Sequence, residues 1–110
     1  MSREYSVFVC LIASLTADGV MHTKICRASN LTRNLARHNR ETKCADKETR
    51  VGAPHWRYVL VIGPMKKGHS SLAQQWRESG NTLQELTTAG MKLGRKLSAG
   101  MGKCAVYYGV

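Results

Sequence analysis

The strongest constraint on the fold is an apolar run near the start of the chain, "EYSVFVCLIA" at residues 4–13, which has no charged residue after Glu4. A strand with one solvent-exposed face would alternate apolar and polar residues. A continuous apolar run indicates a central strand that is buried on both faces. A second run, Tyr58 to Ile62, predicts another strand, and Gly63-Pro64 is expected to stop it. The chain therefore needs a small central sheet flanked by helices.

The segments between and after these runs predict the remaining elements. Asp18-Gly19 indicates a hairpin turn into a partner strand at 20–26. Ser29 or Asn30 can cap a helix over 31–39, because their side chains accept hydrogen bonds from exposed main-chain N–H groups. The polar stretch 40–54, which ends in Gly52 and Pro54, is expected to form a loop.

The C-terminal half predicts helices and a final strand. A helix is expected over 70–80, and one or two short helices over 83–97, where Gly90 and Gly94 weaken the helical pattern. The segment 104–110 is expected to close the chain as a short strand. The order is then ββαβααβ, in a single α/β domain over residues 1–110.

The net charge points to a polyanionic partner. Seventeen Lys and Arg against seven Asp and Glu give a formal charge of +10, which repels itself in a compact fold. Nucleic acid is the leading candidate, and an anionic membrane surface is the other. The basic residues concentrate in 21–50 and after Glu85. These two tracts could form one surface that binds an anionic ligand, or they could lie on two unrelated solvent-exposed faces.

The cysteines indicate an intracellular protein with reduced thiols. They stand at positions 10, 26, 44 and 104 with no CxxC pair, so a zinc knuckle or a thioredoxin-like motif is not expected. Cys10 lies in the apolar run and is predicted to be a core thiol. That run resembles a secretory signal with cleavage after Ala17, but Glu4 and its strand-like composition argue against one.

A short basic segment, "NLTRNLARHN" at residues 30–39, raises the question of phosphate binding. Arg33 and Arg37 are one helical turn apart and share a face. Either they solvate a surface helix, or they contact a phosphate. Trp56 and Trp76 are predicted to pack in or beside the core, with stacking on an unpaired base as the alternative.

The order of these segments resembles the GIY-YIG nuclease domain, in particular its structure-selective, Slx-like branch and short bacterial relatives. The resemblance covers residues 5–80 and depends on "DGVMHTK", "NLTRNLARHN", "APHWRYVLVIG" and "SLAQQW". It implies a fold that cleaves DNA with one divalent metal ion. It also implies that Arg33 contacts the scissile phosphate, and that His38 and His22 take part in catalysis.

The family's catalytic motifs are degenerate in this chain. Phe8 stands where the first motif has a tyrosine, and His22-Thr23-Lys24 stands where the second has Tyr-x-Gly. Gln75 replaces the metal-binding glutamate, and Glu78 is nearly one turn away. Because Mg²⁺ prefers charged oxygen ligands, no metal ligand is assigned, and Mg²⁺ or Mn²⁺ is expected only if the chain is active.

The sequence therefore predicts nucleic-acid binding on a degenerate GIY-YIG scaffold, with an active metal-dependent endonuclease as the alternative. An interaction protein with an unknown protein partner is a third possibility. DNA is preferred over RNA, no membrane partner is expected, and the location is predicted to be the cytoplasm or nucleus. The residues expected to contact phosphates, besides Arg33, are Arg27, Arg37, Arg40, Lys43, Lys47, Arg50, Lys66, Lys67, Lys92, Arg95, Lys96 and Lys103.

Overall fold

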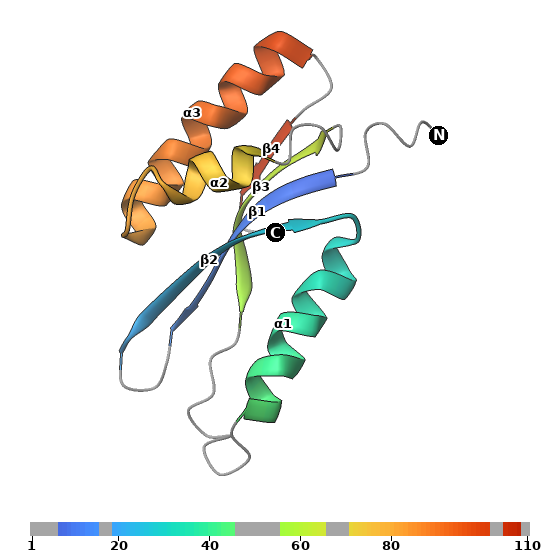
Figure 1. The fold of residues 1–110 in the computed structure, drawn as a ribbon, viewed down its shortest axis with the longest axis vertical. Helices are drawn as coiled ribbons and strands as arrows, with labels where there is room; N and C mark the ends of the chain where they lie inside the picture. The colour runs from blue at the N-terminus through green and yellow to red at the C-terminus, as the bar shows by residue number, and fades with distance from the viewer. Residues whose placement is uncertain (1–6, 16–18, 46–55, 66–70, 102–104, 109–110) are drawn as a thin grey trace.

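The computed structural model describes residues 7–15, 19–45, 56–65, 71–101 and 105–108. The α/β class is confirmed, with a four-stranded antiparallel sheet in the order β2-β1-β3-β4 (Figure 1). The elements along the chain are β1 (Val7–Leu15), β2 (Met21–Ala28), α1 (Leu31–Ala45), β3 (Arg57–Met65), α2 (Ser71–Arg77), α3 (Leu83–Met101) and β4 (Ala105–Tyr108). β2 therefore forms one edge of the sheet.

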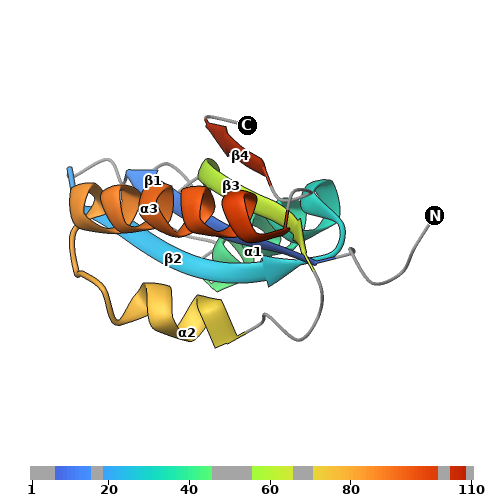
Figure 2. The same ribbon diagram turned by 90° about the horizontal axis from the view of Figure 1, so that it is seen from above.

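The central strand β1 is buried on both faces, as its apolar run predicts. Val9 and Leu11 point to one side, and Cys10 and Ile12 to the other, and each is at most 1% exposed. On the first side the sheet packs against α2 and α3, and on the second side against α1. Figure 1 shows the sheet with α2 and α3 on one side and α1 on the other, and Figure 2 shows α3 in front of the sheet and α1 behind it. The molecule thus has three layers, with a separate core on each side of the sheet.

The predicted hairpin is confirmed, and the third strand is longer than expected. β1 pairs with β2 in antiparallel register, with Cys10 opposite Cys26. β3 does not stop at Gly63-Pro64 but continues to Met65, which pairs with Val7. The register with β1 shifts at this point. A proline is tolerated at such an irregularity because no ladder N–H is required from it.

Helix α1 is also longer than expected, because it continues to Ala45 instead of ending near residue 39. The segment 40–45 is polar but contains no glycine or proline, and most of its residues favour helix. The polarity of this segment therefore did not mark a loop. The rest of the expected loop, 46–54, lies outside the described residues. Within the described residues, no helix is long and apolar enough to cross a membrane.

Helix α3 is one continuous helix, where the sequence left open one or two. It begins with a capping box: the main-chain N–H of Glu85 donates to the Thr82 hydroxyl (3.1 Å), and the N–H of Thr82 donates to the Glu85 carboxylate (3.2 Å). The Thr82 hydroxyl, followed by the N–H groups of Asn81 and Thr82, holds the pKa of Glu85 below its usual value.

Gly90 lies in the middle of α3 because the core leaves no room for a side chain there. A Cβ at this position would overlap the Trp76 ring and come within 2.5 Å of the Leu60 side chain. Trp76 itself is 1% exposed and donates its indole N–H to the Leu86 carbonyl (2.7 Å). The expectation that Trp76 packs in the core is therefore confirmed, and the missing side chain at Gly90 is what lets α3 approach the sheet.

We expect Gly90→Ala to destabilise the fold, although alanine favours helix by about 1 kcal/mol over glycine. The added methyl must displace the Trp76 ring, and such overpacking costs about 1–3 kcal/mol. Urea unfolding followed by tryptophan fluorescence would measure the loss. Thr88→Ala, at an exposed position of the same helix, is the control and should change stability by less than about 0.5 kcal/mol. Equal or higher stability of Gly90→Ala would contradict the packing described here.

Candidate nucleic-acid interface

A basic groove runs along the edge strand β2. It has a volume of about 480 Å³ and is lined by Val7, Lys24, Ile25, Cys26, Arg27, Ala28, Ser29, Arg37 and Arg77. A second hollow of about 210 Å³ adjoins it at the start of α1 and shares Arg27 and Arg37 with it, and Arg33 is among its lining residues. We call the two together the β2 groove. None of its described lining residues is acidic, so the groove is suited to an anion.

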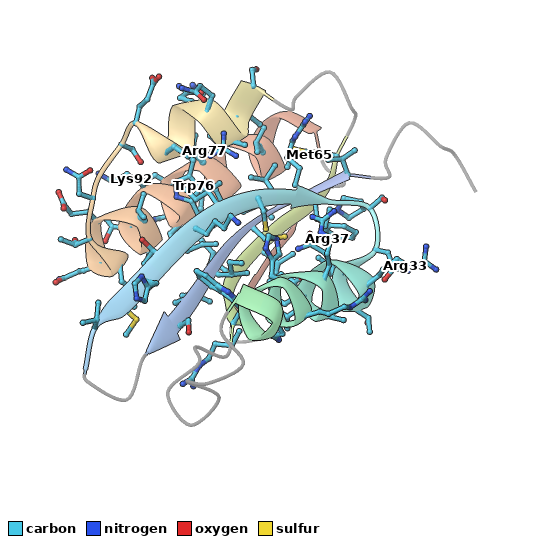
Figure 3. All side chains as sticks on the ribbon, turned by 60° about the horizontal axis from the view of Figure 1, so that its bottom comes forward. Arg33, Arg37, Met65, Trp76, Arg77 and Lys92 are labelled. Atoms are coloured by element: carbon cyan, nitrogen blue, oxygen red, sulfur yellow. The ribbon has the colours of Figure 1, made fainter. Side chains whose placement is uncertain are left out.

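The cations of the groove come from three elements that are distant in the sequence. Lys24 and Arg27 are exposed on β2, Arg33 and Arg37 are exposed on α1, and Arg77 is on α2. Figure 3 shows Arg37 and Arg77 on opposite sides of β2. The edge position of β2 makes this possible, because helices from both layers of the molecule can reach the same strand.

Buried Asn34 positions Arg37. The Asn34 side-chain oxygen accepts a hydrogen bond from the Arg37 guanidinium (3.0 Å), and its amide donates to the Tyr58 hydroxyl (3.2 Å) and the Cys26 sulfur (3.4 Å). Tyr58 in turn donates to the Leu31 carbonyl (2.6 Å). Burial raises the pKa of Tyr58, so its hydroxyl stays protonated. We call these connected side chains the Asn34 network; it fixes one groove arginine to the α1-side core.

Arg77 is held by the edge strand itself. Its guanidinium donates to the main-chain oxygen of Ile25 (3.0 Å). Edge strands expose unpaired main-chain groups, and charged side chains commonly protect them from pairing with another chain. Arg77 occupies one of these acceptors, and a second N–H donates to the Gln74 side-chain oxygen (3.5 Å). Since a guanidinium has five N–H donors, others remain for the groove.

Cys26 and Cys10 form a thiol pair beneath the groove. They are opposite each other on neighbouring strands, both are free, and they share a hydrogen bond. That bond and the one from Asn34, with the charges of Lys24 and Arg37, outweigh burial and lower the pKa of Cys26 to about 7. The same bond, together with burial, raises the pKa of Cys10 far above its usual value. The prediction that Cys10 is a core thiol is confirmed by its complete burial.

The structure does not gather the expected catalytic residues. Arg33 lies in the β2 groove, whereas His38 is 6% exposed and packs with its ring tilted toward Trp56, at 6.4 Å between centroids. His22 is exposed near the start of β2, opposite Ser14, and the groove begins only at Lys24. Arg33 and His38 therefore face different surroundings although they are on one helix.

The other positions of the degenerate motifs are also apart. Phe8 packs against the α1-side core, while Gln75 is exposed on α2 in the opposite layer. Glu78 is exposed and accepts a hydrogen bond from Gln74 (2.9 Å). Among the described residues, no group of three or more His, Cys, Asp or Glu side chains could hold a metal ion.

The expected phosphate-contacting residues divide between two faces. Arg27, Arg33 and Arg37 line the β2 groove, and Arg40 is exposed further along α1. Lys92, Arg95 and Lys96 are exposed on α3, in the opposite layer, and Figure 3 shows Lys92 on that side. The two basic tracts therefore do not form one continuous surface in the described part. Lys43 lies on α1; the predicted contacts outside the described residues are Lys47, Arg50, Lys66, Lys67 and Lys103.

Sequence reasoning missed Lys24 and Arg77 as groove residues. Lys24 counts in the basic tract, but its strand gives no sign that it is at a sheet edge. Arg77 directly follows the core residue Trp76 and precedes Glu78, so the sequence alone assigns it to a helix surface of mixed charge. Only the strand order β2-β1-β3-β4 brings it to the groove. In comparisons with protein-family models, curated proteins and solved structures, none matches this chain.

We expect Asn34→Ala to reduce stability by about 1–3 kcal/mol, the cost of leaving buried polar partners unsatisfied. It removes the bonds to Tyr58, Cys26 and Arg37 at once. Chemical denaturation would measure the change. Thr32→Ala, at an exposed position of the same helix, is the matched control. If both variants unfold at the same denaturant concentration, the Asn34 network does not stabilise the fold.

Proposed function

We propose that the chain binds nucleic acid by holding its phosphate backbone in the β2 groove. The observation that supports this most directly is the composition of the groove: five cationic side chains from three elements line it, namely Lys24, Arg27, Arg33, Arg37 and Arg77, and its described residues include no acid. Arginine matches phosphate well, because its planar N–H groups can donate two parallel hydrogen bonds.

Two of these arginines are already oriented. Arg37 is held by Asn34 and Arg77 by the Ile25 carbonyl, both at 3.0 Å. A side chain that is ordered before binding loses less conformational entropy when the ligand arrives. Arg27, Arg33 and Lys24 are exposed, so they can adjust to the path of the backbone. The groove thus combines side chains that are already fixed with others that can adjust, and both kinds can donate hydrogen bonds to phosphate.

The length of the groove suits a polymer better than a single phosphate. Its lining follows β2 and the next residue from Lys24 to Ser29 and continues into the first turns of α1. A strand residue adds about 3.3 Å to the length of the groove, and each nucleotide of a duplex strand adds about 3.4 Å along the helix axis. The strand part of the groove alone is therefore as long as several nucleotides. The formal charge of +10 adds long-range attraction for such a ligand.

Binding of this kind is expected to be nearly independent of base sequence. Phosphate contacts position a nucleic acid but carry no sequence information. Trp76, the aromatic residue closest in sequence to Arg77, is buried in the core, so it does not offer a stacking surface. Recognition would therefore depend on charge and shape. An intracellular location and DNA as the preferred ligand belong to the same proposal.

The scaffold remains part of the proposal. The hairpin, α1, β3 and α2 follow each other in the order on which the resemblance to the GIY-YIG domain depends, and Arg33 is in the first turn of α1 and in the groove. The separation of His38 and Gln75 from Arg33 favours binding over catalysis. We therefore propose a binding module on a degenerate nuclease scaffold.

We expect affinity for duplex and branched DNA to fall steeply with salt, by a logarithmic slope of about −0.9 per phosphate contact. Arg27→Ala and Arg33→Ala should each weaken binding for all sequences and reduce the slope by about 1. Fluorescence anisotropy from low to physiological salt, with an RNA hairpin as a third ligand, would measure this. Lys92→Ala and Arg95→Ala, which remove the same charge on the opposite layer, are the controls. Affinity that stays flat with salt, or equal losses in the controls, would reject the groove.

We expect no cleavage of plasmid or branched DNA in the presence of Mg²⁺ or Mn²⁺, because the described structure does not gather the expected catalytic residues around Arg33. A nicking assay on the wild-type chain and on Arg33→Ala would check this. Metal-dependent nicking by the wild type that disappears in Arg33→Ala would replace the binding module by the endonuclease alternative.

A further inference from the structure

The thiol pair of Cys10 and Cys26 is not used by phosphate binding, and its geometry suggests a separate chemistry. We propose that Cys26 is a peroxide-reactive thiol and that Cys10 resolves its oxidised form to a disulfide across the β1–β2 hairpin. The proposal concerns a modification site and does not depend on the nucleic-acid partner.

The backbone places the two cysteines within bonding range. Cys10 and Cys26 are direct register partners on antiparallel strands. Directly opposed residues have Cα atoms about 4.5–5.5 Å apart, and disulfides span about 4.4–6.8 Å. Both side chains lie in the same buried cluster on the α1 side of the sheet. A bond between their sulfur atoms therefore needs no change of strand register.

Cys26 is the more accessible of the two thiols, although both are buried. Its residue is 8% exposed and is among those that line the groove of about 480 Å³, whereas Cys10 is completely buried. Hydrogen peroxide is little larger than water, and in this proposal it enters from the groove. Cys26 is therefore the member of the pair that reacts first.

The surroundings of Cys26 favour its thiolate, which is the reactive form. The Cys10 thiol on β1 and the Asn34 amide on α1 donate hydrogen bonds to it, and Lys24 on β2 and Arg37 on α1 add positive charge. The neighbouring Tyr58 on β3 stays neutral, since its pKa is raised. Together these groups lower the pKa of Cys26 to about 7.

The chemistry proceeds in two balanced steps. The Cys26 thiolate attacks one peroxide oxygen, the O–O bond breaks, and a sulfenic acid and hydroxide form. The Cys10 sulfur then attacks the Cys26 sulfur, the S–O bond breaks, and the Cys10 proton leaves with the hydroxyl group as water. The two sulfurs together lose two electrons, and the peroxide accepts them. A dithiol such as dithiothreitol would reverse the reaction.

The test treats the full-length reduced chain with dilute hydrogen peroxide at neutral pH and maps its cysteines by mass spectrometry. We expect a Cys10–Cys26 disulfide that dithiothreitol removes. In Cys10→Ala, which lacks the resolving thiol, a dimedone-type probe should label Cys26 as a sulfenic acid. In Cys26→Ser, Cys10 should gain neither a disulfide nor the probe. Oxidation confined to Cys44 or Cys104, with Cys26 unmodified in the wild type, would overturn the proposal.

A kinetic readout separates a reactive thiol from one that is merely accessible. We expect the rate at which iodoacetamide alkylates Cys26 to rise with pH to a plateau, with a midpoint near pH 7. Asn34→Ala should move that midpoint upward, and each full unit would slow the reaction up to about tenfold below the midpoint. The urea-unfolded chain is the reference: a midpoint no lower than that of the unfolded chain would reject an activated Cys26.

Discussion

The burial of β1 on both faces is the constraint on which the rest of the structure depends. Val9 and Leu11 need apolar cover on one side, and Cys10 and Ile12 need it on the other, so one helical layer would leave half of the strand in water. The chain meets this with α1 in one layer and α2 and α3 in the other. Because β1 and β3 take the centre of the sheet, β2 is left at its edge.

At this edge of the sheet, side chains from both helical layers line the same groove. Main-chain groups at a sheet edge attract further strands unless charged side chains protect them. Here Arg77 from one layer binds the Ile25 carbonyl, and Arg37 from the other lines the same groove. The cations that protect the edge are thus also the ones that give the groove its charge. The protection of the sheet edge and the positive charge of the groove therefore have the same origin.

The sequence was informative where a residue pattern acts locally. The apolar runs predicted β1 and β3, and the four-residue spacing of Arg33 and Arg37 predicted their shared helix face. Polarity was a poor guide to the end of α1, because it reports exposure and not helix breaking. The gap in the pattern at Gly90 could not be interpreted without knowing that Trp76 fills the space beside it. The roles of Arg77 and Asn34 were equally hidden, because both depend on contacts between elements distant in the chain.

The Asn34 network joins the two chemistries that we propose. Asn34 bonds to Arg37, which faces the groove, and to Cys26, which forms its wall. A Cys26 thiolate places one negative charge among the cations, and it weakens their attraction for phosphate. A disulfide with Cys10 removes that charge, and the groove becomes more positive by one unit. The two proposed chemistries would therefore be coupled through electrostatics, and this coupling would need no movement of the backbone.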